Sequence, residues 1–204
     1  MQRKVFDILA SGGGALVTVV LVVAGALLMW GYSFTSSSVH NQLAMQQIYF
    51  PPQAAFAHAK AGTEITPSMI PSVSQYAGQE LLTGQQAEVY ANDFIAVHLS
   101  EMPYHGVYAL ISTAARNATP GSATAAKLTA LESTSFQGTT LRGLLLEAYA
   151  FSTFGTIALW AGVASFVLAF LMALLTGFGI WHARRVPAEE ELLVHHPQSV
   201  IATA

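Results

Sequence analysis

The 204-residue chain contains no cysteine, and only 9% of its residues are charged. Without cysteine it forms no disulfide bond and no thiolate site, so its folded parts must be stabilised by packing. Such a low charge content is unusual for a soluble enzyme and typical of a membrane protein. Eight Lys and Arg residues stand against eleven Asp and Glu residues. No basic face is therefore expected to neutralise phosphates, which argues against nucleic-acid binding.

Two long stretches, Ile8 to Ala59 and Ala148 to Ala183, carry no Asp, Glu, Lys or Arg. Each contains an apolar segment long enough for a helix of about 20 residues to cross a bilayer. The sequence therefore predicts an all-α membrane protein in which two transmembrane helices flank a small helical domain. The predicted parts are a cytoplasmic N-terminus at 1–7, spans at 8–32 and 154–182, an extracytoplasmic domain at 33–153, and a cytoplasmic tail at 183–204.

The cations close to the spans predict the orientation of the chain. Arg3 and Lys4 precede the first span and Arg184 and Arg185 follow the second, whereas only Arg142 lies near a span on the loop side. The excess of Lys and Arg on cytoplasmic loops therefore predicts that both termini are cytoplasmic. The expected location of the protein is the plasma membrane. Trp30, Tyr32 and Trp181 lie at the span ends and, with those four cations, are predicted to contact the membrane interface.

The first apolar segment could instead be a cleaved signal peptide, because Ala24-Gly25-Ala26 offers the small residues that cleavage needs. Apolar character continues through Leu27 to Trp30, however, which is too long for a signal peptide. An uncleaved anchor is the favoured interpretation.

The second span contains a row of small residues at helical spacing. Small residues let two helices approach closely, and such packing is a main source of association in lipid. The predicted packing set is Ala158, Ala161, Gly162, Ser165, Ala169, Ala173 and Gly177. Its partner is predicted to be either the first-span row of Ala10, Gly14 and Thr18 or a helix of another subunit. Neither span contains Asp, Glu, Lys or Arg, which argues against ion or substrate transport.

The central segment is predicted to be helical. Thr83 and Gln86 fit a capping box that opens an amphipathic helix ending near Met102-Pro103. Further helices are predicted from Gly106 to Arg116 and from Ser122 to Ser133. After Gly138, Thr139 or Thr140 is expected to cap a last helix of roughly 40 residues that enters the membrane. Nothing as far as Trp181 would end this helix, and Val186-Pro187 is predicted to end helical character.

Motifs for catalysis are absent from the sequence. His98, Glu101 and His105 form a weak cluster that could reach a metal, but a surface or interface histidine is the favoured interpretation. Asp93 and Glu101 lie about 12 Å apart along a helix, too far for a glycosidase carboxylate pair. No phosphate loop, nucleophile elbow or triad is found. We therefore predict a protein that is not an enzyme and has no catalytic, cofactor-binding or metal-binding residues and no cofactor of its own.

Several segments across nearly the whole chain resemble an actinobacterial family of small two-span membrane proteins. They are Gln2 to Asp7, Ile48 to Pro52, Gly62 to Pro71, Phe94 to Leu99, Phe136 to Gly138, Leu141 to Leu145 and Trp181 to Pro187. Members are often labelled aromatic ring-opening dioxygenases, a label that these residues do not support because no convincing set of iron ligands is present. The resemblance implies association with the mycobacterial cytochrome bcc–aa3 respiratory supercomplex.

These observations favour an accessory, assembly or stability subunit of a larger membrane complex. The predicted partners are integral membrane subunits, cytochrome bcc or aa3 oxidase in particular, together with membrane lipids. The alternative is an extracytoplasmic sensor or a lipid- or small-molecule-binding module. That alternative predicts an apolar cavity between the helix at Thr83–Met102 and the helix that enters the membrane at Leu141.

Overall fold

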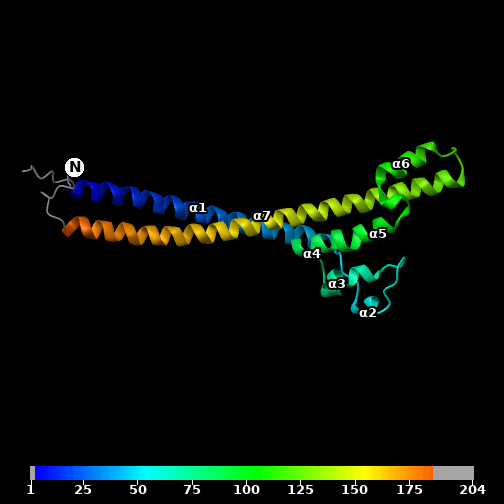
Figure 1. Ribbon diagram of the computed structural model, residues 1–204, viewed down its shortest axis with the longest axis horizontal. Helices are drawn as coiled ribbons and strands as arrows, with labels where there is room; N and C mark the ends of the chain where they lie inside the picture. Colours follow the sequence, from blue (N-terminus) through cyan, green and yellow to red (C-terminus); the bar gives the residue numbers. More distant parts are fainter. Residues whose placement is uncertain (1–2, 186–204) are drawn as a thin grey trace, which may run out of the picture. The chain divides into compact units, whose positions relative to one another are not determined.

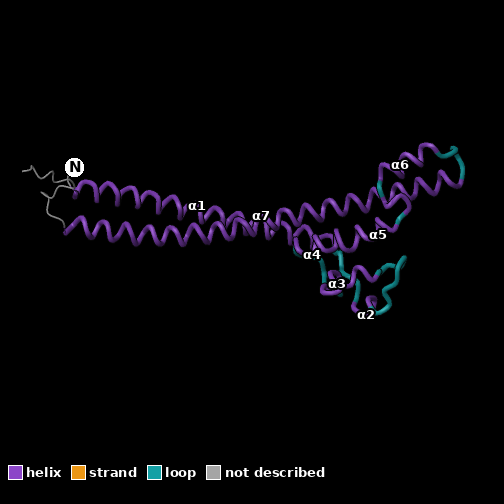
Figure 2. The backbone as a smooth tube through the Cα atoms, in the orientation of Figure 1, coloured by secondary structure: helices purple, strands orange, loops and turns teal. Residues whose placement is uncertain are grey.

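The computed structural model describes residues 3–185, and within that range the protein is all-helical (Figures 1 and 2). No strand forms among these residues, and the only β-type pairing is an isolated bridge between Tyr49 and Glu80. The elements in chain order are α1 (Arg3–Gln46), α2 (Gln53–Phe56), η1 (Pro67–Met69), α3 (Ile70–Val73), η2 (Ser74–Tyr76), α4 (Gly84–Val89), η3 (Tyr90–Ile95), α5 (Ala96–Glu101), η4 (Pro103–Gly106), α6 (Tyr108–Asn117) and α7 (Ala123–Arg185).

Two helices dominate the fold: α1 has 44 residues and α7 has 63. Both contain apolar stretches long enough to cross a membrane. The prediction of separate helices before and after Gly138 is wrong, because α7 runs through this glycine without a break. No proline interrupts residues 123–185, and close packing accounts for a glycine at position 138. A Cβ atom at Gly138 would lie 2.9 Å from the Leu99 Cδ2 atom, so the absence of a side chain lets α5 approach α7.

The chain divides into two compact units. The first, here called the paired-helix unit, combines the beginning of α1 up to Trp30 with α7 from Ala158 onward. The second, the middle unit, runs from Gly31 to Ile157. The predicted cytoplasmic tail beyond Arg185 lies outside the described residues.

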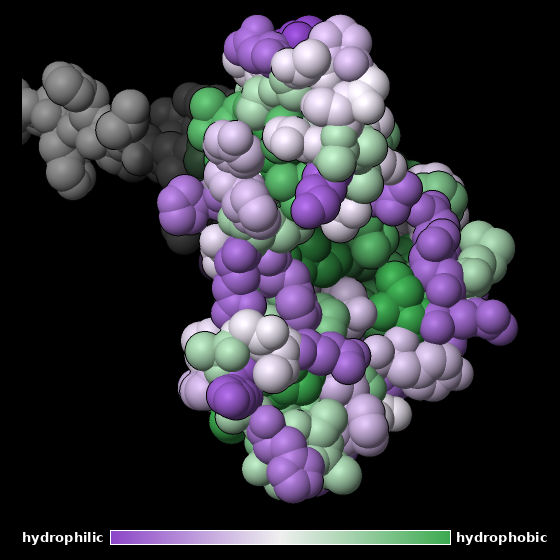
Figure 3. All heavy atoms as spheres, turned by 90° about the vertical axis from the view of Figure 1, so that its right-hand side faces the viewer, coloured by the Kyte–Doolittle hydropathy of each residue, from purple (hydrophilic) through white to green (hydrophobic). Residues whose placement is uncertain are grey.

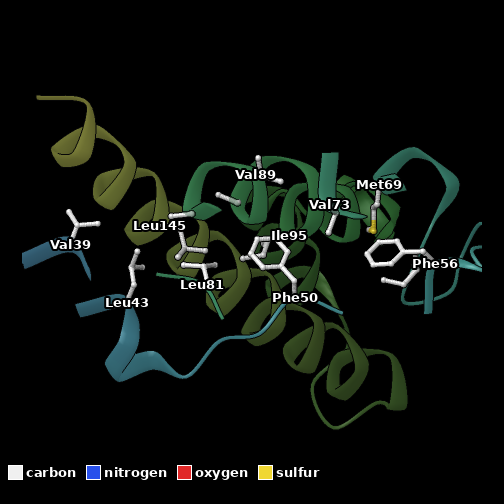
Figure 4. Packing of buried hydrophobic residues seen from close by; sticks show 13 residues of the cluster. Val39, Leu43, Phe50, Phe56, Met69, Val73, Leu81, Val89, Ile95 and Leu145 are labelled. Carbon is white, nitrogen blue, oxygen red and sulfur yellow. The ribbon is translucent and has the colours of Figure 1, made fainter. Parts of the chain in front are cut away.

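A hydrophobic cluster forms the core of the middle unit, as the close view in Figure 4 shows. Met69, Val73 and Leu81 are completely buried in it, and Phe50 is 2% exposed. α1 and α7 also contribute side chains, such as Leu43 and Leu145. The cluster consists of Val39, Leu43, Phe50, Phe56, Ile65, Met69, Val73, Leu81, Ala87, Val89, Ala91, Ile95 and Leu145.

The predicted capping box opens α4. The Gln86 backbone N–H donates to Thr83 Oγ1 at 3.2 Å, and Gln86 Oε1 accepts from the Thr83 backbone N–H at 3.0 Å. The helical stretch ends after Glu101, because Met102 is extended before Pro103. The sequence did not predict the π-helical segment η3, which interrupts this stretch between α4 and α5.

A left-handed turn separates α5 from α6. Tyr104, His105 and Gly106 have φ angles of 59°, 54° and 64°. A side chain at Gly106 would overlap the Leu99 carbonyl oxygen, so glycine is required there. The turn is held to α7 by Ser135 Oγ, which donates to the Gly106 carbonyl oxygen at 2.6 Å.

Candidate functional site

In the paired-helix unit, α1 and α7 pack through glycines that lie against the other helix. A methyl group at Gly179 would come within 2.6 Å of Ser11 Oγ, and one at Gly14 would overlap Thr176 Oγ1. The close pairs between the two helices are Gly14 with Thr176, Gly179 with Ser11, Gly25 with Phe166, and Gly162 with Met29. Small residues thus allow the two backbones to approach each other closely, as in many membrane helix pairs.

Ala24, Met29 and Leu159 are half-buried outside the pattern, but most buried and half-buried positions in the paired-helix unit recur at alternating three- and four-residue steps. On α1 they are Asp7, Ser11, Gly14, Thr18, Leu21, Gly25 and Leu28. On α7 they are Ala158, Gly162, Ser165, Ala169, Met172, Thr176, Gly179 and Ala183. This average step of 3.5 residues is the pattern of a left-handed coiled coil. We call these positions the seam.

The predicted packing set on the second span is divided between two faces of α7. Ala158, Gly162, Ser165 and Ala169 lie in the seam, whereas Ala161, Ala173 and Gly177 are exposed. A row of four-residue steps turns by about 40° per step around a helix of 3.6 residues per turn, so it cannot stay on one face. The seam residues Met172, Thr176, Gly179 and Ala183 were missed. A search for alternating steps would have found them.

The first-span row is also divided. Gly14 and Thr18 lie in the seam, and Ala10 is exposed. Thr18 Oγ1 donates to the Gly14 carbonyl oxygen at 2.8 Å, so its hydroxyl group is satisfied within α1. Thr18 can therefore lie in an apolar interface without an unpaired polar group.

The predicted interface residues are mostly exposed. Trp30 and Trp181 are 67% and 54% exposed, and Tyr32 is partly buried. Lys4, Arg184 and Arg185 are exposed. The two arginines differ, because the Arg185 guanidinium lies 4.1 Å from the Trp181 ring centroid in a cation–π contact. Arg3 begins α1, and its side chain lies outside the described part.

A continuous row of aromatic rings runs through the middle unit. Phe50 contacts Tyr76 and Tyr90, with centroid distances of 5.1 and 5.3 Å. Tyr90 contacts Phe94 at 4.7 Å, and Phe94 contacts the His98 ring at 4.6 Å. Burial, and secondarily the charge of Glu64, raises the pKa of Tyr90. The neutral phenol is therefore the favoured form in this row.

The two histidines of the weak metal-binding candidate face backbone oxygens. His98 Nδ1 and Nε2 each lie 2.9 Å from a carbonyl oxygen, those of Phe94 and Glu64. His105 Nδ1 lies 3.4 Å from the Ser100 carbonyl oxygen. Within residues 3–185, no three His, Asp or Glu side chains are grouped as metal ligands would be. His98 instead ties the loop at Glu64 to the η3–α5 stretch.

The middle unit contains an apolar groove of about 520 Å³ between α1 and α7. Leu141 forms part of one wall, as expected for the predicted cavity, but the other wall is α1 and not the α4–α5 stretch. Apolar side chains provide most of the lining, and the amides of Gln42 and Gln46 and the carboxylate of Glu147 provide polar groups. The apolar lining residues are Phe34, Val39, Leu43, Leu141, Leu144, Leu145, Ala148 and Phe151.

A second apolar feature of the middle unit is a surface patch around η4, α6 and the facing part of α7. The Tyr108 and Phe136 rings lie 5.8 Å apart and are 42% and 57% exposed. The α6 patch, as we call it, is this pair of rings, and Tyr104, Val107 and Leu110 in the same stretch of chain are also exposed apolar residues. Figure 3 views the molecule from this end and shows hydrophobic residues between hydrophilic ones. Patches of this kind on a water-facing surface usually mark a contact site.

Comparison of the chain with protein families, curated proteins and solved structures finds no match. The resemblance to actinobacterial two-span proteins therefore stays a prediction.

Proposed function

We propose that the protein is a non-catalytic accessory subunit that stabilises a larger membrane complex. In this proposal α1 and α7 span the plasma membrane, both termini are cytoplasmic, and the middle unit is the extracytoplasmic domain. The family resemblance of the sequence suggests the complex, the actinobacterial cytochrome bcc–aa3 respiratory supercomplex. The protein itself carries no cofactor in this role, because haem and copper would belong to its partner subunits.

The α6 patch is the observation that carries this proposal. Exposed apolar side chains on the paired-helix unit need no protein partner, since lipid covers them in a membrane. The same explanation fails for Tyr108, Leu110 and Phe136 if the middle unit faces water. A protein surface that shields them would gain roughly 25 cal/mol for each Å² of apolar area removed from water. A brace on the outer face of a complex fits this requirement.

The outward face of α7 supports a partner within the membrane as well. Ala161, Ala173 and Gly177 are exposed, and a side chain at Gly177 would meet no described atom within 4 Å. A helix of another subunit could approach α7 closely at these positions.

Co-purification tests the proposal. The tagged full chain, extracted from native membranes in mild detergent, is expected to carry haem-containing oxidase subunits that absorption spectra and mass spectrometry identify. The double variant Tyr108→Ser/Phe136→Ser removes both rings of the α6 patch and is expected to lower the recovered haem at least fivefold. Ile70→Ser is the matched control, because Ile70 is an exposed apolar residue on α3.

A monomer without haem or oxidase subunits, recovered in mild detergent, would contradict the proposal. An equal loss of haem in the Ile70→Ser control would show that the α6 patch is not the contact. Far-UV circular dichroism and the melting temperature of each variant separate lost contact from lost folding.

The orientation can be tested separately, because a chain without cysteine accepts single reporter thiols. Thr119→Cys places one on the exposed turn between α6 and α7, and Val5→Cys places one near the start of α1. A membrane-impermeant maleimide is expected to label Cys at 119 in intact cells and Cys at 5 only after lysis. Labelling in the opposite order would overturn the proposed topology.

The apolar groove supports a second candidate function, a lipid- or small-molecule-binding module. Its volume of about 520 Å³ lies within the usual range of ligand sites, and a few amides and one carboxylate accompany an apolar lining. Organic extracts of the native membranes are expected to raise the melting temperature of the full chain if this function is correct. Leu144→Trp, which places a bulky ring in the groove wall, would then abolish the shift. No shift with any extract would exclude this candidate.

A further inference from the structure

The paired-helix unit contains a second cleft, with a volume of about 550 Å³, at the end where α1 begins and α7 ends. Its two charged lining residues, Lys4 on α1 and Arg184 on α7, lie near the helix ends. The rest of the lining is mainly apolar or small, and includes Ile8, Gly12, Ala15 and Ile180. Ser11 and Ala183, 7% and 6% exposed, lie in its wall where the two helices meet.

Charge and apolar surface are separated along this cleft. Ala15 follows Lys4 by eleven positions, a distance of about 16 Å along a helix that rises 1.5 Å per residue. That length corresponds to one leaflet of a hydrocarbon core about 30 Å thick. On α7, Ile180 lies one turn deeper than Arg184. The cleft therefore has a cationic mouth and an apolar interior, in the order of a phospholipid headgroup and its chain.

The other charged groups nearby do not line the cleft. Arg185 stacks on Trp181, 4.1 Å from the ring centroid, and does not line the cleft. The carboxylate of Asp7 also lies outside the lining, and its Oδ2 is 4.0 Å from His182 Nε2. The described cleft wall contains no carboxylate that would compete with a bound anion for Lys4 and Arg184.

We propose that this cleft binds one anionic phospholipid, with the phosphate between Lys4 and Arg184 and one acyl chain along Gly12 and Ala15. Glycine at position 12 keeps the cleft open, since a side chain there would meet no described atom within 4 Å and would occupy free space. The site requires both helices to span the membrane, but it is independent of the α6 patch and of the identity of any partner complex. A bound lipid would join the two helix ends across the seam.

Native mass spectrometry of the full chain in detergent tests the site, with phosphatidylglycerol and phosphatidylcholine of identical acyl chains as probes. We expect one phosphatidylglycerol to bind at least tenfold more tightly than phosphatidylcholine. Basic residues near a membrane surface each strengthen anionic-lipid binding to an extent that corresponds to about fivefold in affinity. Lys4→Gln and Arg184→Gln are therefore each expected to weaken phosphatidylglycerol about fivefold.

Matched controls separate a built site from general attraction to basic residues. Gly12→Leu fills the cleft and should abolish the single tight adduct. Gly13→Leu adds the same side chain beside it, at a position that does not line the cleft, and should leave the adduct intact. Arg185→Gln removes an equal charge outside the cleft and should change the affinity less than twofold.

Equal affinity for the two lipids, or equal losses in the Arg184→Gln and Arg185→Gln variants, would overturn the proposal. Displacement of the lipid by millimolar inorganic phosphate would overturn it too, because the headgroup alone would then account for binding. Co-purification of haem subunits through the α6 patch is expected to survive in all these variants, so failure of the lipid site and failure of the proposed function are distinguishable.

Discussion

The paired-helix unit buries small side chains, whereas the middle unit buries large apolar ones. Ser11, Gly25, Gly162 and Ala169 are buried in the first. The second buries Phe50, Met69 and Leu81. In the paired-helix unit large apolar residues such as Leu16 and Phe170 are exposed, 67% and 64%. Large apolar side chains are therefore buried in the middle unit and exposed in the paired-helix unit.

This difference is the one expected if the paired-helix unit lies in lipid and the middle unit in water, as proposed. In water, burial of apolar area drives packing, so the middle unit collects its large side chains in a core. Lipid is as apolar as leucine, so helices there associate by close packing of small residues. The comparison predicts that shortening a side chain damages the middle unit and that lengthening one damages the paired-helix unit.

The chain supplies separate spectroscopic probes for the two units. All three tryptophans, Trp30, Trp160 and Trp181, belong to the paired-helix unit, whereas all seven tyrosines belong to the middle unit. Tryptophan fluorescence and tyrosine near-UV circular dichroism can therefore follow unfolding of the two units in one sample.

The largest expected effect is loss of the buried ring at Phe50. Phe50→Ala removes the contacts with Tyr76 and Tyr90 and leaves a cavity, so the free energy of unfolding of the middle unit should fall by about 3–5 kcal/mol. Tyrosine circular dichroism during urea unfolding measures this change. Phe136→Ala is the control, because Phe136 is 57% exposed and should change stability by less than about 0.5 kcal/mol. An equal loss of stability in the paired-helix unit, measured by tryptophan fluorescence, would contradict the difference between the two units.

The opposite change is expected to affect the paired-helix unit. Gly14→Leu forces a side chain against Thr176 and should destabilise the helix pair by about 1–3 kcal/mol. Tryptophan fluorescence during unfolding in sodium dodecyl sulfate would report the loss. Gly13→Leu adds the same side chain where no described atom lies within 4 Å and should be neutral. Equal effects at both positions would mean that helix propensity, and not packing, matters here.

The capping box offers a smaller test in the middle unit. Thr83→Ala removes the oxygen that accepts from the Gln86 amide, so stability should fall by about 1 kcal/mol. Tyrosine circular dichroism measures the change. Thr119→Ala removes an exposed threonine side chain from the turn before α7 and should have almost no effect. If both variants kept wild-type stability, the capping box would not contribute to the free energy of unfolding of the middle unit.

The smallest expected effect is the pH dependence that Tyr90 contributes. Its pKa is raised above the ordinary value of 10.0, mainly by burial and also by Glu64. At a pH between the unfolded value of 10.0 and the raised folded value, the unfolded chain has lost the Tyr90 proton that the folded chain retains. The contribution of Tyr90 to stability is therefore fully present below pH 10 and declines as the pH rises above it. Tyr90→Phe should flatten this part of the stability curve measured by tyrosine circular dichroism. An unchanged slope would show that other groups cause it.

Several parts of the fold followed from local sequence signals. The two apolar stretches predicted two helices that could cross a membrane, and the structure contains them. Thr83 and Gln86 predicted the start of α4, and Met102-Pro103 predicted the end of α5. These signals are reliable because capping and proline act on backbone groups a few residues away.

Other features depended on contacts that no local pattern reveals. Gly138 was taken as a helix break, but it is a close contact with Leu99 inside α7. η3 also carried no signal in the sequence. The packing set was drawn along four-residue steps, whereas the seam alternates steps of three and four, because two paired helices coil around each other.

The sequence by itself determined that the chain is helical, that two helices are apolar enough for a membrane, and where the capped helix of the middle unit begins and ends. Composition and neighbouring residues suffice for these properties, since lipid solubility and backbone hydrogen bonds are local. Only the tertiary structure decided which small residues form the seam, which apolar side chains remain exposed in the α6 patch, and that Lys4 and Arg184 share one cleft. Residues far apart in the chain create these features, and their side chains meet only after the helices have packed.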